Sequence, residues 1–439
     1  MASRLSAPGP QEKRFAAYTE GLATAAGHED RHAPLKDYCK GLLLPGERKS
    51  IEPMAARLSP HSVQAARQSL HHLVAKAPWS DQALLDEVRR QVLPAMQKHG
   101  RPVAWVVDDT GFPKKGRHSV GVTRQYCGQV GKQENCRIAV SLSLATWNAS
   151  LPIAYRLYLP KDWAEDAKRR KKAEVPDSVE FHTKPEIALD QIRAAVSAGV
   201  ARGVLLADAA YGINTDFRDG LTAVELQYVV GVQSSMTVWE PGKQPLPPKP
   251  RGKKGRPPRL LQRSSDHHPV PVKQLAMNLP STAFRQITWR EGTERKLQSR
   301  FAAVRVRAAH RDYWKPEPHA EEWLLIEWPK TEAEPAKYWL STLPPNTKLT
   351  DLVKMAKHRW IIERDYQELK QELGLGHYEG RNWRGFHHHA TLCIAAYGFL
   401  VAERTRFSPS ARAGHLEFAA LEKVPDFRPR GSPRSPRAA

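Results

Sequence analysis

The sequence predicts a mixed α/β protein in which helices cover a central sheet, and three observations support this fold class. Runs typical of buried strands occupy the middle of the chain, amphipathic helical patterns precede and follow them, and acidic residues end two of the buried runs. Because open α/β sheets form their sites at the carboxyl ends of strands, those acids point to a functional site.

The charge balance indicates a polyanionic partner. The 439 residues include 68 Lys and Arg against 46 Asp and Glu, a formal charge of +22, and we expect nucleic acid rather than a membrane surface. The longest apolar run, 391–402, is too short to span a bilayer, so we expect a buried helix there. No secretory segment is visible and none of the four cysteines forms a CxxC pair, which predicts a cytoplasmic protein with reduced cysteines.

Helical periodicity dominates the first part of the chain. Two segments, "HSVQAARQSLHHLVAKA" and "QALLDEVRRQVLPAMQKHG", repeat apolar residues at helical spacing. We expect residues 1–97 to form an N-terminal helical, DNA-binding domain.

Residues 98–232 are expected to form the first part of the sheet-containing core. "PVAWVVDD", "RIAVSLSLAT" and "LPIAYRLYL" are expected to be neighbouring antiparallel strands. The helix "KPEIALDQIRAAVSAGVARG" and the strands "GVLLAD" and "LQYVVGV" follow. Asp108 and Asp109 end the first strand and Asp208 ends the fourth, so we expect them to meet at one edge of the sheet.

The remaining chain divides into three parts. Residues 233–345 are expected to be a β-rich insertion with a basic Pro/Gly arm, 346–405 the C-terminal helical part of the core, and 406–439 a basic, flexible tail. The arm carries the cations Lys253, Lys254 and Arg256. They could enter an A·T-rich minor groove, although a flexible linker touching phosphates without selectivity is the favoured interpretation.

One helix, "HRWIIERDYQELKQELGL", carries an unusual polar stripe. Arg359, Glu363, Tyr366 and Lys370 are spaced to share one side of a helix, and Gly374 is expected to end it. A solvated charged face is the ordinary explanation. The alternative is that Glu363 meets the two strand-end acids, where clustered carboxylates repel one another unless a hard cation such as Mg²⁺ binds them.

These residues carry a resemblance to a known family. The spacing R-x3-E-x6-K at Arg359, Glu363 and Lys370 matches most of the Y-R-E-K signature of DDE transposases of bacterial insertion sequences. "LLLPGERKSIEPMA", "DDTGFPKKG", "LLADAAYG" and "RWIIERDYQELKQELGLGHYEGRNWRGFHHH" resemble the insertion sequence 701 family, related to the insertion sequence 4 group. The resemblance implies an RNase-H-like core interrupted by a β-strand insertion.

The resemblance also implies roles for individual residues. Asp109, followed by Thr110, would be the first metal-binding acid, Asp208 the second and Glu363 the third, and Asp108 is a rival for the first. Together they would bind two Mg²⁺ ions, for which we expect Mn²⁺ to substitute. Arg359 and Lys370 would contact DNA phosphates, and Tyr366 would take over the phosphate contact of the signature tyrosine, whose position holds Ala356.

The expected function is therefore a DNA transposase that cleaves double-stranded DNA at its element's terminal repeats and joins the ends to target DNA as a homodimer in the bacterial nucleoid. Two alternatives remain open. One is an RNase-H-like nuclease or resolvase without strand transfer, and the other is a catalytically silent, transposase-derived DNA-binding protein.

Overall fold

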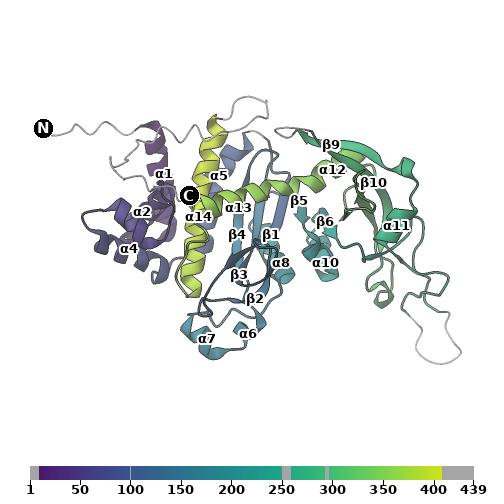
Figure 1. The fold of residues 1–439 in the computed structure, drawn as a ribbon, viewed down its shortest axis with the longest axis horizontal. Coiled ribbons are helices and arrows are strands. Elements are labelled where there is room, and N and C mark those ends of the chain that lie inside the picture. Colours follow the sequence, from purple (N-terminus) through teal and green to yellow (C-terminus); the bar gives the residue numbers. More distant parts are fainter. Residues whose placement is uncertain (1–8, 99, 250–258, 292–295, 408–439) are drawn as a thin grey trace, which may run out of the picture.

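The computed structural model describes residues 9–98, 100–249, 259–291 and 296–407. Among these residues, a 12-stranded mixed sheet runs through the molecule, with a helical region at one end and a strand-rich region at the other (Figure 1). The predicted α/β class, with an RNase-H-like sheet flanked by helices, is confirmed.

The N-terminal helices form a packed unit with the last helix of the chain. Leu84, Val88 and Val92 share one hydrophobic core with the last helix, and the Tyr18 hydroxyl donates a 2.7 Å hydrogen bond to the Ala395 carbonyl. The helical region is thus joined to the rest of the protein by a continuous core. Its elements are α1 (Pro10–Ala26), η1 (Glu29–Arg31), α2 (His32–Leu43), α3 (Ile51–Leu58), α4 (Val63–Ala75) and α5 (Asp81–Gln97).

The core sheet has the order β4-β3-β1-β5-β6, with β4, β3 and β1 antiparallel and β1, β5 and β6 parallel. The strand β2 extends one end of β3 as a hairpin. The expected antiparallel arrangement of the first three long strands is confirmed. The strands are β1 (Ala104–Pro113), β2 (Thr123–Cys127), β3 (Lys132–Ala145), β4 (Ser150–Leu157), β5 (Val204–Ala207) and β6 (Tyr228–Val232), and the helices among them are α6 (Lys161–Ala164), α7 (Ala167–Lys172), α8 (Lys184–Ser197), α9 (Ala209–Gly212) and α10 (Thr215–Ala223).

The insertion continues the same sheet. Its strand β12 pairs antiparallel with β6, and β11, β10, β7 and β8 follow in order, with β9 paired to β10. The arm residues 250–258, with Lys253, Lys254 and Arg256, lie outside the described residues, as does 408–439 of the tail. The elements are β7 (Thr237–Trp239), β8 (Val270–Pro271), α11 (Val272–Asn278), η2 (Ser281–Ala283), β9 (Arg285–Glu291), β10 (Lys296–Ala308), η3 (Asp312–Trp314), β11 (Glu321–Glu327) and β12 (Lys337–Ser341).

The chain returns to the core through α12 (Leu349–Lys357), η4 (His358–Trp360), α13 (Ile361–Gln371) and α14 (Trp383–Phe407). Ile361 and Ile362 are buried in a cluster with Val106 of β1 and Leu206 of β5, so α13 covers that face of the sheet. Gly374 has a φ of 66°, a conformation that suits glycine and ends the helical region as expected.

The apolar run 391–402 lies within α14 and is almost entirely buried. Across the described part of the chain, no helix is long and apolar enough to cross a membrane. All four cysteines are buried and free, as the sequence predicted.

Candidate active site

Two of the predicted acids lie level with each other on adjacent parallel strands. Val106 of β1 pairs with Leu206 of β5, and Asp108 and Asp208 each follow two residues later. Because side chains alternate between faces along a strand, Asp108 points to the face that α13 covers. Asp208 directly follows the last residue of β5 and interacts electrostatically with Asp108 and with Arg359. Asp208 is also the N-cap of α9 and accepts a 2.9 Å hydrogen bond from the Ala210 amide.

Asp109 points to the other face of the sheet. It shares that face with Val107, which is buried in the cluster that also contains Ile187 of α8. Its carboxylate lies 2.6 Å from the ammonium of Lys184, at the start of α8. The structure thus separates the neighbouring acids, with Asp108 toward α13 and Asp109 toward α8.

The first strand is longer than its apolar run suggested. The sequence placed Asp108 and Asp109 at its end, but β1 continues to Pro113 because residues 109–113 pair with residues 136–140 of β3. These acids therefore lie inside the sheet, where their backbone groups are held by neighbouring strands.

The stripe faces the sheet, although the single helix expected from residue 358 is divided into the 3-10 turn η4, which holds Arg359, and α13, which begins at Ile361. Arg359 donates a 2.8 Å hydrogen bond to the Asp108 carboxylate, and the Tyr366 hydroxyl is bonded to Ser141, the β3 partner of Asp108. Lys370 donates a 3.0 Å hydrogen bond to the Gly111 carbonyl. Three of the four residues are thus tied to β1 and β3, which contradicts a merely solvated face.

The fourth residue of the stripe, Glu363, is the exposed one. Its side chain is 68% exposed and its carboxylate lies 3.9 Å from the guanidinium of Arg359. The guanidinium interacts electrostatically with Asp108, Asp208 and Glu363, and these three carboxylates raise the pKa of Arg359 despite its burial. Arg359 is therefore a positive charge that interacts with all three acids, in direct contact with Asp108 and 3.9 Å from Glu363.

The electrostatics of Asp108 favour a cation beside it. Burial raises the pKa of Asp108 to about 6; Arg359 opposes this shift, whereas Asp208 and Asp109 add to it. A carboxylate in this setting is stabilised by additional positive charge, and carboxylate oxygens are suitable ligands for Mg²⁺ or Mn²⁺. The chemistry of the Asp108 carboxylate therefore suits a divalent cation. Among the described residues, however, no three His, Cys, Asp or Glu side chains are already grouped closely enough to hold one, so the ligand set stays a prediction.

Sequence reasoning missed a tyrosine beside the acids. Tyr211 lies three residues after Asp208, and its buried hydroxyl has no hydrogen-bond partner among the described residues. Burial is the main cause that raises the pKa of Tyr211, and Asp109, Asp108 and Asp208 add to the shift. The signal in the sequence was its spacing of about one helical turn from Asp208.

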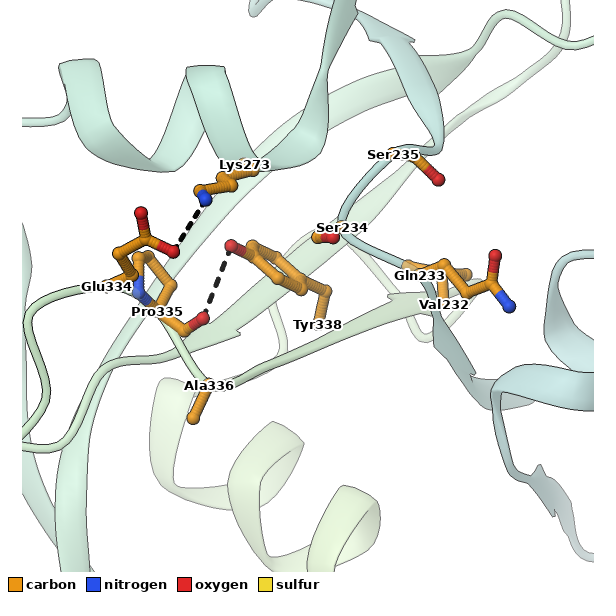
Figure 2. Close-up of a pocket in the computed structure, with 9 residues that line it drawn as sticks. All are labelled: Val232, Gln233, Ser234, Ser235, Lys273, Glu334, Pro335, Ala336 and Tyr338. Atoms are coloured by element: carbon orange, nitrogen blue, oxygen red, sulfur yellow. Dashed lines mark hydrogen bonds and ion pairs between the residues drawn. The ribbon is translucent and has the colours of Figure 1, made fainter. Parts of the chain in front are cut away.

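A cavity of about 400 Å³ in the insertion has none of these acids in its lining (Figure 2). Its two charged side chains, Lys273 and Glu334, pair with each other at 2.5 Å. The Tyr338 hydroxyl donates to the Pro335 carbonyl. With its charges paired internally, this cavity offers no excess positive charge to a phosphate.

Similarity to known proteins shows the family of the chain. The chain belongs to the DDE superfamily endonucleases, whose family profile matches residues 21–296. That span contains Asp108, Asp109 and Asp208 and ends before α13. Over 170 residues the chain is also 32% identical to a protein of Microchaete diplosiphon described as "Probable transposase for insertion sequence element IS701". This alignment covers 38% of the chain and 41% of that relative, and the family resemblance seen in the motifs is confirmed.

Proposed function

We propose that this protein is a DNA transposase that cleaves phosphodiester bonds at the ends of its own mobile element and joins those ends to target DNA. The observation that carries the proposal is the level placement of Asp108 and Asp208 on one face of the sheet, with the helix bearing Glu363 packed over that face. Membership of the DDE endonucleases and the description of the insertion-sequence relative support it.

Within this proposal, Asp108, the rival candidate, takes the role that the family resemblance gave to Asp109. Asp108 shares a face with Asp208 and contacts Arg359, whereas Asp109 points to α8 and pairs with Lys184. The guanidinium of Arg359 contacts Asp108 and lies 3.9 Å from Glu363, and it also interacts electrostatically with Asp208. We therefore assign cation binding to these three acids.

Divalent cations bound there would supply positive charge that stabilises the attacking and leaving oxygens of an in-line phosphoryl displacement. The protein's own cations have a separate task. Arg359 presents a planar guanidinium suited to two phosphate oxygens, and Lys370 lies where β1 meets α13. Because Tyr366 is bonded to Ser141, we assign it to positioning α13 rather than to phosphate contact.

Transposition requires the two ends of one element, and we propose that a homodimer holds them. The test uses purified protein, a supercoiled plasmid carrying the element's own flanking ends, and Mg²⁺ or Mn²⁺. We expect nicks at the element ends that leave 3′-hydroxyl groups, followed by joined products. Cleaved ends without joined products would indicate the nuclease alternative, and binding without cleavage would indicate a silent DNA-binding protein.

A further inference from the structure

A second cavity, of about 490 Å³, lies between the N-terminal helices and the loop that joins α13 to α14. Its size is within the range of small-ligand sites. Two of the family-like motifs that contain no candidate acid line this cavity. Lys49, Ser50 and Ile51 come from "LLLPGERKSIEPMA", and His377 and Arg381 come from "GHYEGRNWRG". Residues far apart in the sequence thus build one cavity beside the segment that leaves the Glu363 helix.

The lining carries an excess of positive charge. Its cations outnumber its carboxylates by five to three among the described residues. Two of the carboxylates are already paired, Glu174 with Lys76 at 3.2 Å and Glu379 with Arg48 at 2.8 Å, and Glu52 is the third. By contrast, Arg381 has no ion-pair partner within the part of the chain that the structure describes. The five cations are Lys49, Arg67, Lys76, Lys172 and Arg381.

The N-terminus of α3 opens into the same cavity. Ser50 is its N-cap, and Ser50, Ile51 and Glu52 all line the cavity. The first amide groups of a helix have no intrahelical acceptor and favour an anion. In α3 these are the amides of Ile51 and Glu52, because Pro53 has no amide hydrogen. An N-cap serine normally covers one of them, but the Ser50 side chain makes no cap hydrogen bond.

The Ser50 hydroxyl is an independent sign of a ligand. Ser50 is 8% exposed, and its hydroxyl has no hydrogen-bond partner among the described residues although it lines the cavity. A hydroxyl in this position can donate to a group that enters the cavity. A bound oxyanion would accept from this hydroxyl and from the α3 amides at the same time.

We propose that this cavity binds a backbone phosphate of the DNA strand held by the enzyme, through Ser50, the N-terminus of α3 and Arg381. The inference rests on the proposed function, because it requires DNA as the substrate. It adds a phosphate contact between the N-terminal helices and the loop 372–382. This contact is separate from the acids and from Arg359 and Lys370. DNA anchored there would be fixed relative to the segment that directly follows α13.

The test is a binding experiment without catalysis. Duplexes of the element's end are prepared with a single neutral methylphosphonate at each backbone position in turn, and their affinities are compared for the wild-type protein, Ser50→Ala, Arg381→Ala and the control Arg202→Ala. Arg202 is an exposed cation that pairs with Glu225, away from the cavity. Melting temperatures confirm that the variants fold.

We expect one methylphosphonate position to weaken wild-type binding by about tenfold, the effect of losing charged hydrogen bonds. Arg381→Ala should bind the unmodified duplex about tenfold more weakly than the wild type. A methylphosphonate at the sensitive position should then reduce the affinity of this variant only slightly further. Ser50→Ala should show the same loss of sensitivity, and Arg202→Ala should behave like the wild type.

Two results would overturn the site. One is wild-type affinity in both Ser50→Ala and Arg381→Ala, and the other is equal sensitivity of these variants and the wild type at every position. Competition by free dAMP without any position-specific effect would also overturn it, because the cavity would then take a nucleotide rather than the strand. A wild-type protein that binds end DNA without cleaving it would contradict the proposed function but leave this site intact.

Discussion

The guanidinium of Arg359 donates a 2.8 Å hydrogen bond to the carboxylate of Asp108, linking the 3-10 turn η4, which directly precedes α13, to the middle of β1. Both side chains are partly buried, at 28% and 18% exposure. Arg359 belongs to the transposase-like signature, and its contact with Asp108 shows that Asp108, not Asp109, faces the helix that carries Glu363.

Replacing Arg359 should slow cleavage according to what the new side chain retains. We expect Arg359→Ala to reduce end nicking by about ten- to a hundredfold, the range for losing hydrogen bonds between charged groups. Arg359→Lys should fall between Ala and the wild type, because it keeps the charge but loses the planar fork. Nicking rates on an end duplex measure this, and a fully active Arg359→Ala would remove Arg359 from the site.

Glu363→Gln should abolish cleavage while preserving the fold and DNA binding. The side chain is 68% exposed, so the substitution should change the free energy of unfolding by no more than about 0.5 kcal/mol, yet it removes a ligand charge. The matched control is Glu372→Gln, an exposed glutamate just after the same helix. Retained cleavage by Glu363→Gln, measured together with its melting temperature and DNA affinity, would place the third acid elsewhere.

The buried His389 should make the protein less stable in mild acid. Its Nε2 lies 3.0 Å from the Gly374 carbonyl and its Nδ1 lies 2.8 Å from the Tyr38 hydroxyl, an arrangement that suits the neutral ring. Burial lowers the pKa of His389 from 6.5 to about 4. The unfolded chain therefore binds a proton that the folded protein does not, and stability present above about pH 6.5 is lost as the pH falls toward 4.

Burial also raises the pKa of Asp365 to about 6, so this residue stabilises the folded protein as the pH falls and opposes the effect of His389. The contribution of His389 is therefore measured by comparing a His389 variant with the wild type. We expect His389→Gln to be less stable than the wild type at neutral pH but to lose stability less steeply from about pH 6.5 to about pH 5. The largest slope that a single histidine contributes is about 1.4 kcal/mol per pH unit. Urea unfolding at several pH values measures it, with the exposed His72→Gln as control; parallel profiles for His389→Gln and the wild type would contradict the assignment.

Binding to nonspecific duplex DNA should weaken steeply with salt. The formal charge of +22 provides many possible phosphate contacts, and each neutralised phosphate contributes about −0.9 to the slope of log K against log salt. We expect a slope steeper than about −3 in a fluorescence anisotropy titration. A shallower slope would mean that the excess charge is not directed at DNA.

The sequence predicted the secondary-structure elements of this site better than it predicted the contacts between them. Helical periodicity correctly grouped Arg359, Tyr366 and Lys370 on one side of a helix, because that spacing is local. The motif resemblance favoured Asp109 over Asp108 as the first acid. Neighbouring strand residues point to opposite faces, so only one of the two can face α13. The choice depends on which face α13 covers, and that follows from long-range packing of Ile361 and Ile362.

Long-range pairing also explains what else the sequence left out. The sequence predicted a β-rich insertion over residues 233–345. The pairing of its strand β12 with β6, which joins the insertion to the core sheet, depends on residues about a hundred positions apart. The cavity at Ser50 likewise needs segments from both ends of the chain. Neither the β12–β6 pairing nor the cavity at Ser50 can be predicted from a local periodic pattern in the sequence.

The most direct test of the account compares Asp108→Asn with Asp109→Asn in Mg²⁺-dependent nicking of an end duplex. Both substitutions remove one charge and keep nearly the same shape, and the two positions are adjacent in β1. Because Asp108 shares the face of Asp208 and the Glu363 helix, the account predicts that Asp108→Asn abolishes nicking while Asp109→Asn retains measurable activity. An inactive Asp109→Asn together with an active Asp108→Asn would contradict it.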